Sequence, residues 1–273
     1  MQDSATREQQ AFDLLLPLAP ATRAIEQRYR TALLGVLTPA NRKAIGAAIA
    51  RSLLAHDPGF RSIVAAVDPL LDPAERVALT AAVVTYLDEM GALYEPVEER
   101  LDAVFGVRDR KDEPSNAGAA ADPARAAIHM VAQLLAPERT EPATLAETKE
   151  TTLLQNCLPD DAPRLRRMRT SMLEALSPEQ HSSVEDAIAH YVTSIVPDRP
   201  ALIARVGALL SEPQRDQILT AYGTFTFAQK AAFHARIAAD KEYSRTLVES
   251  PDDADPAALL VQVILMSHLP GSG

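Results

Sequence analysis

Apolar residues recur at three- and four-residue intervals along most of the chain, separated by polar ones. This period is typical of amphipathic helices. In the first half it predicts helices over residues 10–37, 39–56, 59–71 and 123–136, and a long helix that starts at Pro73. In the second half it predicts a lead-in over 141–158 and helices over 163–176, 178–196, 199–210, 213–248 and 256–269. Because no period-two alternation is long enough for a strand, we expect an all-α fold.

The helix that starts at Pro73 is the longest of the first half. Its apolar residues alternate steps of four and three, which predicts a coiled-coil seam packed along a partner helix. The seam positions are Val83, Leu87, Met90, Tyr94, Val97, Leu101 and Val104. Pro96 lies inside this helix and predicts a kink near Ala92. A polar segment over 108–121 predicts an exposed loop after it.

One short pattern occurs four times. It reads Leu, then Thr, Asp or Ser, then two residues that include a Pro, then Asn, Glu or Gln, then Arg or His. The four copies contain Leu37, Thr38 and Asn41; Leu71, Asp72 and Glu75; Leu176, Ser177 and Gln180; and Leu210, Ser211 and Gln214. The second residue suits an N-cap, the Pro suits the first turn, and the polar residue three positions after the cap completes a capping box. The pattern therefore predicts four helix starts.

The spacing of the copies indicates an internal duplication. Within each half, the first residues of the two copies are 34 positions apart. A shift of 139 residues aligns 28–76 with 167–215 without a gap, and 15 of the 49 aligned pairs are identical. Chance alone gives roughly 4 for this Ala- and Leu-rich composition. We therefore predict two tandem copies of a roughly five-helix unit, over residues 10–137 and 150–270.

Composition narrows the class of protein. With 273 residues and 47% apolar content, the chain can form one large core or two ordinary ones. A net charge of −10 argues against a general nucleic-acid or anionic-membrane surface, and no run of about 18 apolar residues predicts a membrane span. The basic stretch 164–169 is interpreted as a solvated helix face. The single cysteine, Cys157, excludes an intrachain disulfide.

No catalytic or metal-binding constellation is apparent. His181 and Glu185, and likewise Asp186 and His190, are four residues apart and could each supply two metal ligands. However, nine residues correspond to two and a half helical turns, so His181 and His190 point to opposite faces. The chain has no nucleophile elbow and no glycine-rich phosphate loop. We therefore expect a protein that is not an enzyme and that has no cofactor.

The repeated Leu-Thr/Ser-x-x-Gln core resembles the motif of the Spy/CpxP-like family of periplasmic stress proteins. The copies at Leu176 and Leu210 fit with Ser in place of Thr, whereas Asn41 and Glu75 replace Gln in the first half. The resemblance implies small helical proteins with two motifs each that form cradle-shaped antiparallel dimers. Some act as ATP-independent chaperones or envelope-stress regulators, and related proteins bind metals. Each half of this chain is about one such protomer long.

Three hypotheses follow for function. The first is a non-enzymatic protein that binds unfolded clients, as a chaperone or envelope-stress protein. The second is a helical scaffold, adaptor or secreted effector with one specific protein partner, and the third is a metal-responsive sensor. The expected partners are proteins, including a second copy of the chain, and not nucleic acid. The first residues lack the apolar region of a signal peptide. We expect a periplasmic protein if the native gene encodes a signal peptide, and a cytoplasmic or secreted one otherwise.

Overall fold

A computed structural model describes residues 10, 13–55, 59–105, 127, 128, 131, 132, 135, 162–239 and 255–265. The described residues contain helices and no strands, so the predicted all-α class is confirmed. The elements of the first half are η1 (Leu16–Leu18), α2 (Ala19–Val36), α3 (Pro39–Leu54), α4 (Phe60–Val67), η2 (Asp68–Leu70) and α5 (Pro73–Phe105). Those of the second half are α8 (Ala162–Leu173), α9 (Pro178–Thr193), α10 (Arg199–Gly207), α11 (Glu212–Ala239) and α12 (Pro256–Leu265).

Prolines and caps set most of these bounds. Pro39, Pro73 and Pro178 are each the first residue of a helix, where the missing N–H costs no hydrogen bond. Near Pro17 the chain forms the 3-10 turn η1 before α2 begins, in place of one bent helix from residue 10. Helix α5 continues through Pro96. The predicted loop over 108–121 and Cys157 lie outside the described residues, whereas residues 127, 128, 131, 132 and 135 of the predicted helix 123–136 are helical and buried.

The chain divides into two compact units. Unit 1 contains Met1–Arg42 and Asp68–Val131, and unit 2 contains Lys43–Val67 and Ala132–Gly273. Helix α3 thus begins in unit 1 and continues into unit 2. The repeat bounds 10–137 and 150–270 concern duplication of the sequence rather than packing, and they stay a prediction.

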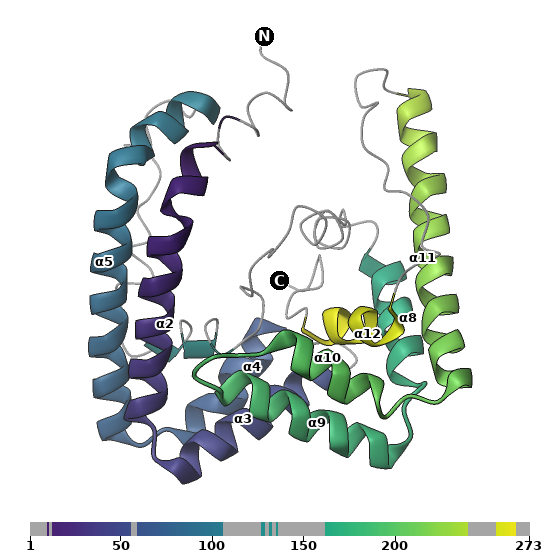
Figure 1. The fold of residues 1–273 in the computed structure, drawn as a ribbon, viewed down its shortest axis with the longest axis horizontal. Helices are drawn as coiled ribbons and strands as arrows, with labels where there is room; N and C mark the ends of the chain where they lie inside the picture. The colour runs from purple at the N-terminus through teal and green to yellow at the C-terminus, as the bar shows by residue number, and fades with distance from the viewer. Residues whose placement is uncertain are drawn as a thin grey trace. The chain divides into compact units, whose positions relative to one another are not determined.

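Unit 1 is built on an antiparallel pair of helices, α2 and α5 (Figure 1). Residues that lie later in α2 contact residues that lie earlier in α5, which fixes the antiparallel direction. The contacts are a hydrogen bond of 3.1 Å between the Thr22 and Tyr94 hydroxyls, an ion pair of 2.6 Å between Arg28 and Glu89, and a stacked Tyr29–Tyr86 pair with ring centroids 4.4 Å apart.

The seam between these two helices differs from the predicted one at Leu87. The Leu87 side chain is 51% exposed, whereas Tyr86 is 4% exposed and lies against Tyr29. The buried seam therefore begins Leu79, Val83, Tyr86. The prediction for Leu87 was wrong because a step of three after Val83 satisfies the helical period as well as a step of four, and the aromatic pair favours position 86.

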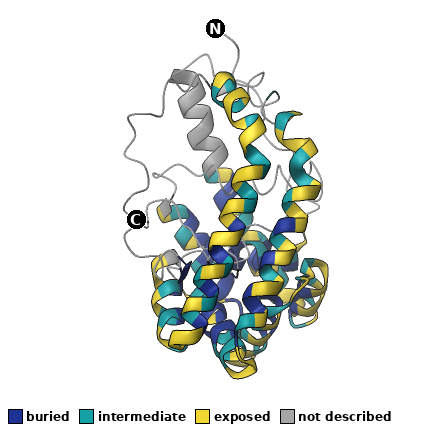
Figure 2. Ribbon diagram, turned by 90° about the vertical axis from the view of Figure 1, so that its left-hand side faces the viewer, coloured by how far each residue is buried: buried dark blue, intermediate teal, exposed yellow. Residues whose placement is uncertain are grey.

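Unit 2 packs several helices around α12. Helix α12 lies against α8, α10 and α11, and seven of its ten residues are buried. Helices α3 and α9 approach so closely that a Cβ at Gly46 would lie 2.8 Å from Thr193 Cγ2, so only glycine fits there without a shift. An ion pair of 3.4 Å between Arg51 and Glu185 joins the same two helices. Figure 2 marks the buried residues along each helix in dark blue.

Helix α5 also has the length and composition of a membrane span over Pro73–Val104, alone among the helices of the described ranges. No such span was expected from the sequence. The segment includes Asp88 and Glu89, and Glu89 forms the ion pair with Arg28 of α2. Length and composition are thus the only features of α5 that indicate a span.

Candidate functional site

The four sequence motifs lie at the starts of α3, α5, α9 and α11, and their leucines are all buried. The clearest capping box is at Ser177, whose hydroxyl accepts from Gln180 N–H while its own N–H donates to Gln180 Oε1 at 2.8 Å. Asp72 and Glu75 form the same reciprocal pair, with distances of 2.8 and 3.2 Å. These two copies act as the helix starts that the sequence predicts.

Each motif also binds a second motif. We name Ser177, Gln180, Ser211 and Gln214 the C-terminal clasp. The Gln180 and Gln214 amides donate to each other's Oε1 oxygens at 3.0 and 2.6 Å. Each amide also donates to the carbonyl just before the other motif, Gln180 to Leu209 and Gln214 to Ala175. Because each Oε1 also accepts its own cap N–H, both glutamines are fully hydrogen-bonded.

The N-terminal clasp consists of Thr38, Asn41, Asp72 and Glu75. Here a carboxylate replaces one amide: the Glu75 oxygens accept from Thr38 N–H at 2.9 Å, from the Asn41 side chain at 2.7 Å and from Asp72 N–H at 3.2 Å. The carboxylate cannot donate, so the reciprocal amide pair becomes one charge-assisted bond from Asn41. The two clasps thus have equivalent positions but different charge.

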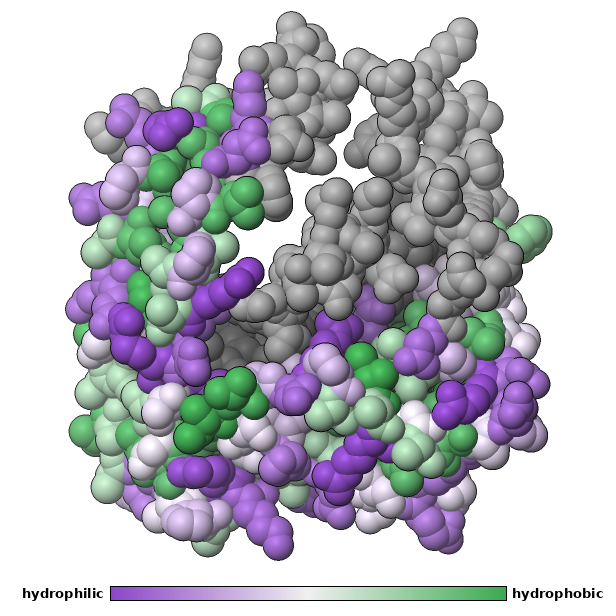
Figure 3. Space-filling view, viewed as in Figure 1, coloured by the Kyte–Doolittle hydropathy of each residue, from purple (hydrophilic) through white to green (hydrophobic). Residues whose placement is uncertain are grey.

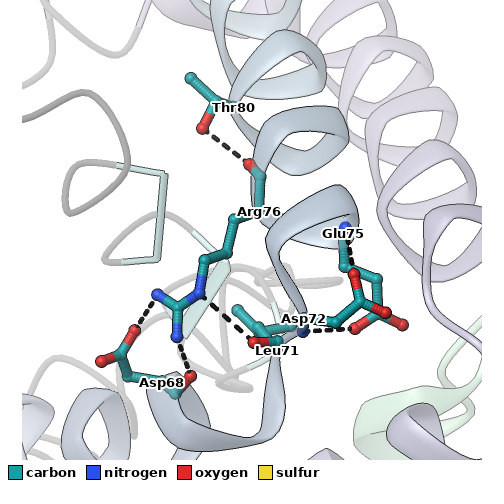
Figure 4. Close-up of polar contacts among 6 residues, drawn as sticks. All are labelled: Asp68, Leu71, Asp72, Glu75, Arg76 and Thr80. Atoms are coloured by element: carbon teal, nitrogen blue, oxygen red, sulfur yellow. Dashed lines mark hydrogen bonds and ion pairs between the residues drawn. The ribbon is translucent and has the colours of Figure 1, made fainter.

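The basic residue that ends each motif reaches back to the carbonyl eight positions earlier. The pairs are Arg42 with Leu34, Arg76 with Asp68, His181 with Leu173, and Arg215 with Gly207. Arg76 and Arg215 also donate Nε–H to the carbonyl five positions earlier, at 3.3 Å in both cases. Figure 4 shows Arg76 reaching Asp68 and Leu71 beside the Asp72–Glu75 box. Each of these basic side chains therefore hydrogen-bonds to carbonyls at the end of the preceding helical segment, where a cation or donor is favourable.

Glu75 is the buried carboxylate of this arrangement. Burial raises the pKa of Glu75, but the hydrogen bonds from Thr38, Asn41 and Asp72 together lower it further, and the net pKa lies below the ordinary value. The ionised form is therefore stabilised in the folded state. Because the folded pKa is depressed, the contribution of Glu75 to stability is complete above about pH 4.5 and is lost as the pH falls through the folded pKa.

We expect acid to weaken the N-terminal clasp more than the C-terminal one. As the pH falls below about 4.5, the wild-type chain should lose more unfolding free energy than Glu75→Gln, whose amide does not titrate. Urea unfolding at several pH values measures the difference. The reverse variant, Gln214→Glu, should gain acid sensitivity in the C-terminal clasp. Parallel pH profiles for wild type and Glu75→Gln would contradict the role given to Glu75.

Arg169 of α8 is a further polar centre, in unit 2. Its side chain is 0% exposed, and its guanidinium donates to the carbonyls of Leu53, Ala55 and Val263. These carbonyls lie at the C-terminal ends of α3 and α12, where the helix dipole favours a cation. The interpretation of 164–169 as a solvated face was therefore wrong for Arg169, although Arg167 is exposed. Helical spacing from the buried Leu165 to Met172 was the available signal.

Two of the residues that the sequence singled out as possible metal ligands make other contacts. His181 Nε2 lies 3.0 Å from Leu173 O, and Glu185 pairs with Arg51. Across the described part of the chain, no three His, Cys, Asp or Glu side chains form a group that could hold a metal ion. The side chains of His56, His129, His234 and His268 lie outside the described residues.

Comparisons with protein-family models, with curated proteins and with solved structures find no match to this chain. The fold and the site define a class by themselves: an all-α protein in which the polar residues of a repeated motif form internal contacts. In the described copies these residues are committed to capping helices and to binding each other. These residues therefore have a structural role.

Proposed function

We propose that this chain is a non-enzymatic protein-binding helical protein, an ATP-independent chaperone or envelope-stress protein of the kind that the Spy/CpxP resemblance implies. The observation that carries the proposal is a set of large apolar side chains left at the surface of a helical scaffold. In unit 1 they include Val77 (72% exposed), Val84 and Leu87; in unit 2 they include Ile195, Val196 and Phe227 (77% exposed). Figure 3 shows apolar residues reaching the surface along α2 and α5.

Such side chains favour contact with other apolar surfaces. Fully burying a side chain the size of Val or Leu contributes about 1.5–3 kcal/mol, part of which offsets the entropy lost on association. Single exposed apolar residues are ordinary on proteins, but a group on one helix marks a contact surface. Because the motif residues are occupied internally, we assign client contact to this apolar surface and not to the motif.

We further propose that the two halves arose by duplication, as in a covalent version of a family dimer. The supporting observation is that contacts of the motif residues recur at a constant shift of 139 residues, as between positions 41 and 75 and positions 180 and 214. The bond from Arg76 to the carbonyl at 68 has its counterpart in the bond from Arg215 to the carbonyl at 207. The Arg42–Leu34 contact likewise corresponds to His181–Leu173. A periplasmic location belongs to the same proposal, because the family acts there.

Suppression of client aggregation tests the proposed function. We expect a few-fold molar excess of the full chain to reduce light scattering from a chemically denatured client on dilution, equally with and without ATP. An unrelated acidic helical protein of similar size is the control. Unchanged scattering at a several-fold excess would contradict chaperone activity. A pulldown that instead yields one stoichiometric folded partner would favour the scaffold hypothesis.

A further inference from the structure

One face of α5 combines exposed apolar residues and exposed acidic residues in a definite order. The helical period places Val77, Ala81, Val84, Leu87 and Gly91 within one stripe about 120° wide, and all five are exposed. Four acidic residues, Asp88, Glu95, Glu98 and Glu99, lie in the same stripe after Leu87 and are also exposed. We name these nine residues the outer stripe of α5. From its first to its last residue the stripe is about 33 Å long, at 1.5 Å per residue.

From this order we infer that the outer stripe binds an amphipathic helical segment whose apolar part is followed by Lys or Arg residues. Val84 and Leu87 would pack on the apolar part, and Glu95 and Glu99 would attract the basic part. The C-terminal end of α5 adds the negative end of its helix dipole. The inference rests on the proposed protein-binding function and specifies the chemistry of the partner.

Two features of the stripe fit a helical partner better than a lipid surface. A Cβ added at Gly91 would meet no atom within 4 Å, so packing inside the chain does not require a glycine at this mid-helix position. A small residue there permits close approach of a second helix, as small residues do at helix–helix contacts. The acidic half of the stripe would be repelled by an anionic membrane and would remain without apolar contact on a neutral one.

Fluorescence anisotropy with designed peptides tests the inference. The probe is a labelled 22-residue helix-forming peptide with a Leu/Ala stripe in one half and Lys in the same stripe of the other half. The matched control peptide carries Glu at the Lys positions. We expect the full chain to bind the Lys peptide about tenfold more tightly than the Glu peptide at low salt, and this preference to shrink at high salt.

Variants then locate the binding. Val84→Ser with Leu87→Ser should weaken binding of the Lys peptide about tenfold, as expected when central apolar contacts are lost. Glu95→Gln with Glu99→Gln should reduce the Lys-over-Glu preference, and Asp88 and Glu98 should retain the remainder. Val196→Ser, which changes another side chain that is 65% exposed, should leave binding unchanged. Circular dichroism should show equal helicity for all variants, since every substituted position is exposed.

The outcomes separate this inference from the function on which it rests. Equal binding of both peptides, or tight binding that the α5 variants do not alter, would overturn the inference. The proposed chaperone function would then still depend on the aggregation assay alone. Binding to neutral lipid vesicles that the Val84/Leu87 variant abolishes, without peptide binding, would also overturn it in favour of a membrane surface. Selective peptide binding without suppression of client aggregation would support peptide binding by the outer stripe and contradict the chaperone function.

Discussion

Replacing Arg169 with methionine is expected to lower the unfolding free energy by about 3–5 kcal/mol, since up to three buried carbonyls lose their donor at about 1–3 kcal/mol each. Methionine fills similar space but cannot donate a hydrogen bond. The carbonyls of Leu53, Ala55 and Val263 would lose their guanidinium donor, and buried acceptors left unpaired are costly. Because these acceptors lie at the ends of α3 and α12, the loss would loosen both helices where they meet α8.

Urea unfolding, monitored by circular dichroism, measures this effect. Two further variants serve as controls. Arg167→Met changes an exposed neighbour on the same helix and should shift stability by less than about 0.5 kcal/mol. Arg169→Lys retains the charge but not the planar fork of donors, so its unfolding free energy should lie between those of the wild type and Arg169→Met. If Arg169→Met proved as stable as Arg167→Met, the guanidinium would not hold these helix ends together.

The second large effect is expected at the C-terminal clasp. Gln180→Ala and Gln214→Ala should each cost about 2–3 kcal/mol, because each removes one side of the reciprocal amide pair and leaves a carbonyl without its donor. The double variant should cost less than the sum of the two. A double-mutant cycle should therefore give a coupling energy of about 1–2 kcal/mol between the two glutamines.

Gln217→Ala provides the matched control for this cycle. Gln217 lies on the same helix as Gln214, is exposed, and donates one hydrogen bond, to Ser171 O at 3.1 Å. Its loss should cost less than about 1 kcal/mol and should be additive with Gln180→Ala. Additivity of the Gln180 and Gln214 substitutions would show that the two motifs cap their helices independently.

The sequence predicted the helix starts well because the residues that start a helix act on their immediate neighbours in the sequence. Pro and cap residues mark most helix starts, and the described helices after α2 begin within one residue of the predicted positions, whereas α2 begins at Ala19 and not at residue 10. The helical period alone did not determine which of two adjacent residues faces the partner helix. Leu87 and Tyr86 both continue a heptad pattern from Val83, and only the partner ring of Tyr29 selects between them.

Contacts between distant segments were beyond this kind of prediction. The 34-residue spacing of the motifs was visible, but nothing in it showed that Gln180 and Gln214 would bind each other. Arg169 was interpreted as part of a solvated face because it lies in an Arg-rich stretch whose apolar residues keep helical spacing, whereas its side chain is buried and donates to the carbonyls of three remote residues. A side chain's hydrogen-bond partners depend on tertiary packing, which periodicity alone does not contain.

Unit 2 consists of two segments that are far apart in the sequence, and this has a consequence for synthesis on the ribosome. Residues 43–67 are made early, yet their unit also requires 132–273. Leu53 and Val263, which share Arg169 as a donor, are more than 200 residues apart in the sequence. While the nascent chain grows, the apolar side chains of α3 and α4 must therefore wait for their later partners, and this interval is when the protein is most exposed to aggregation.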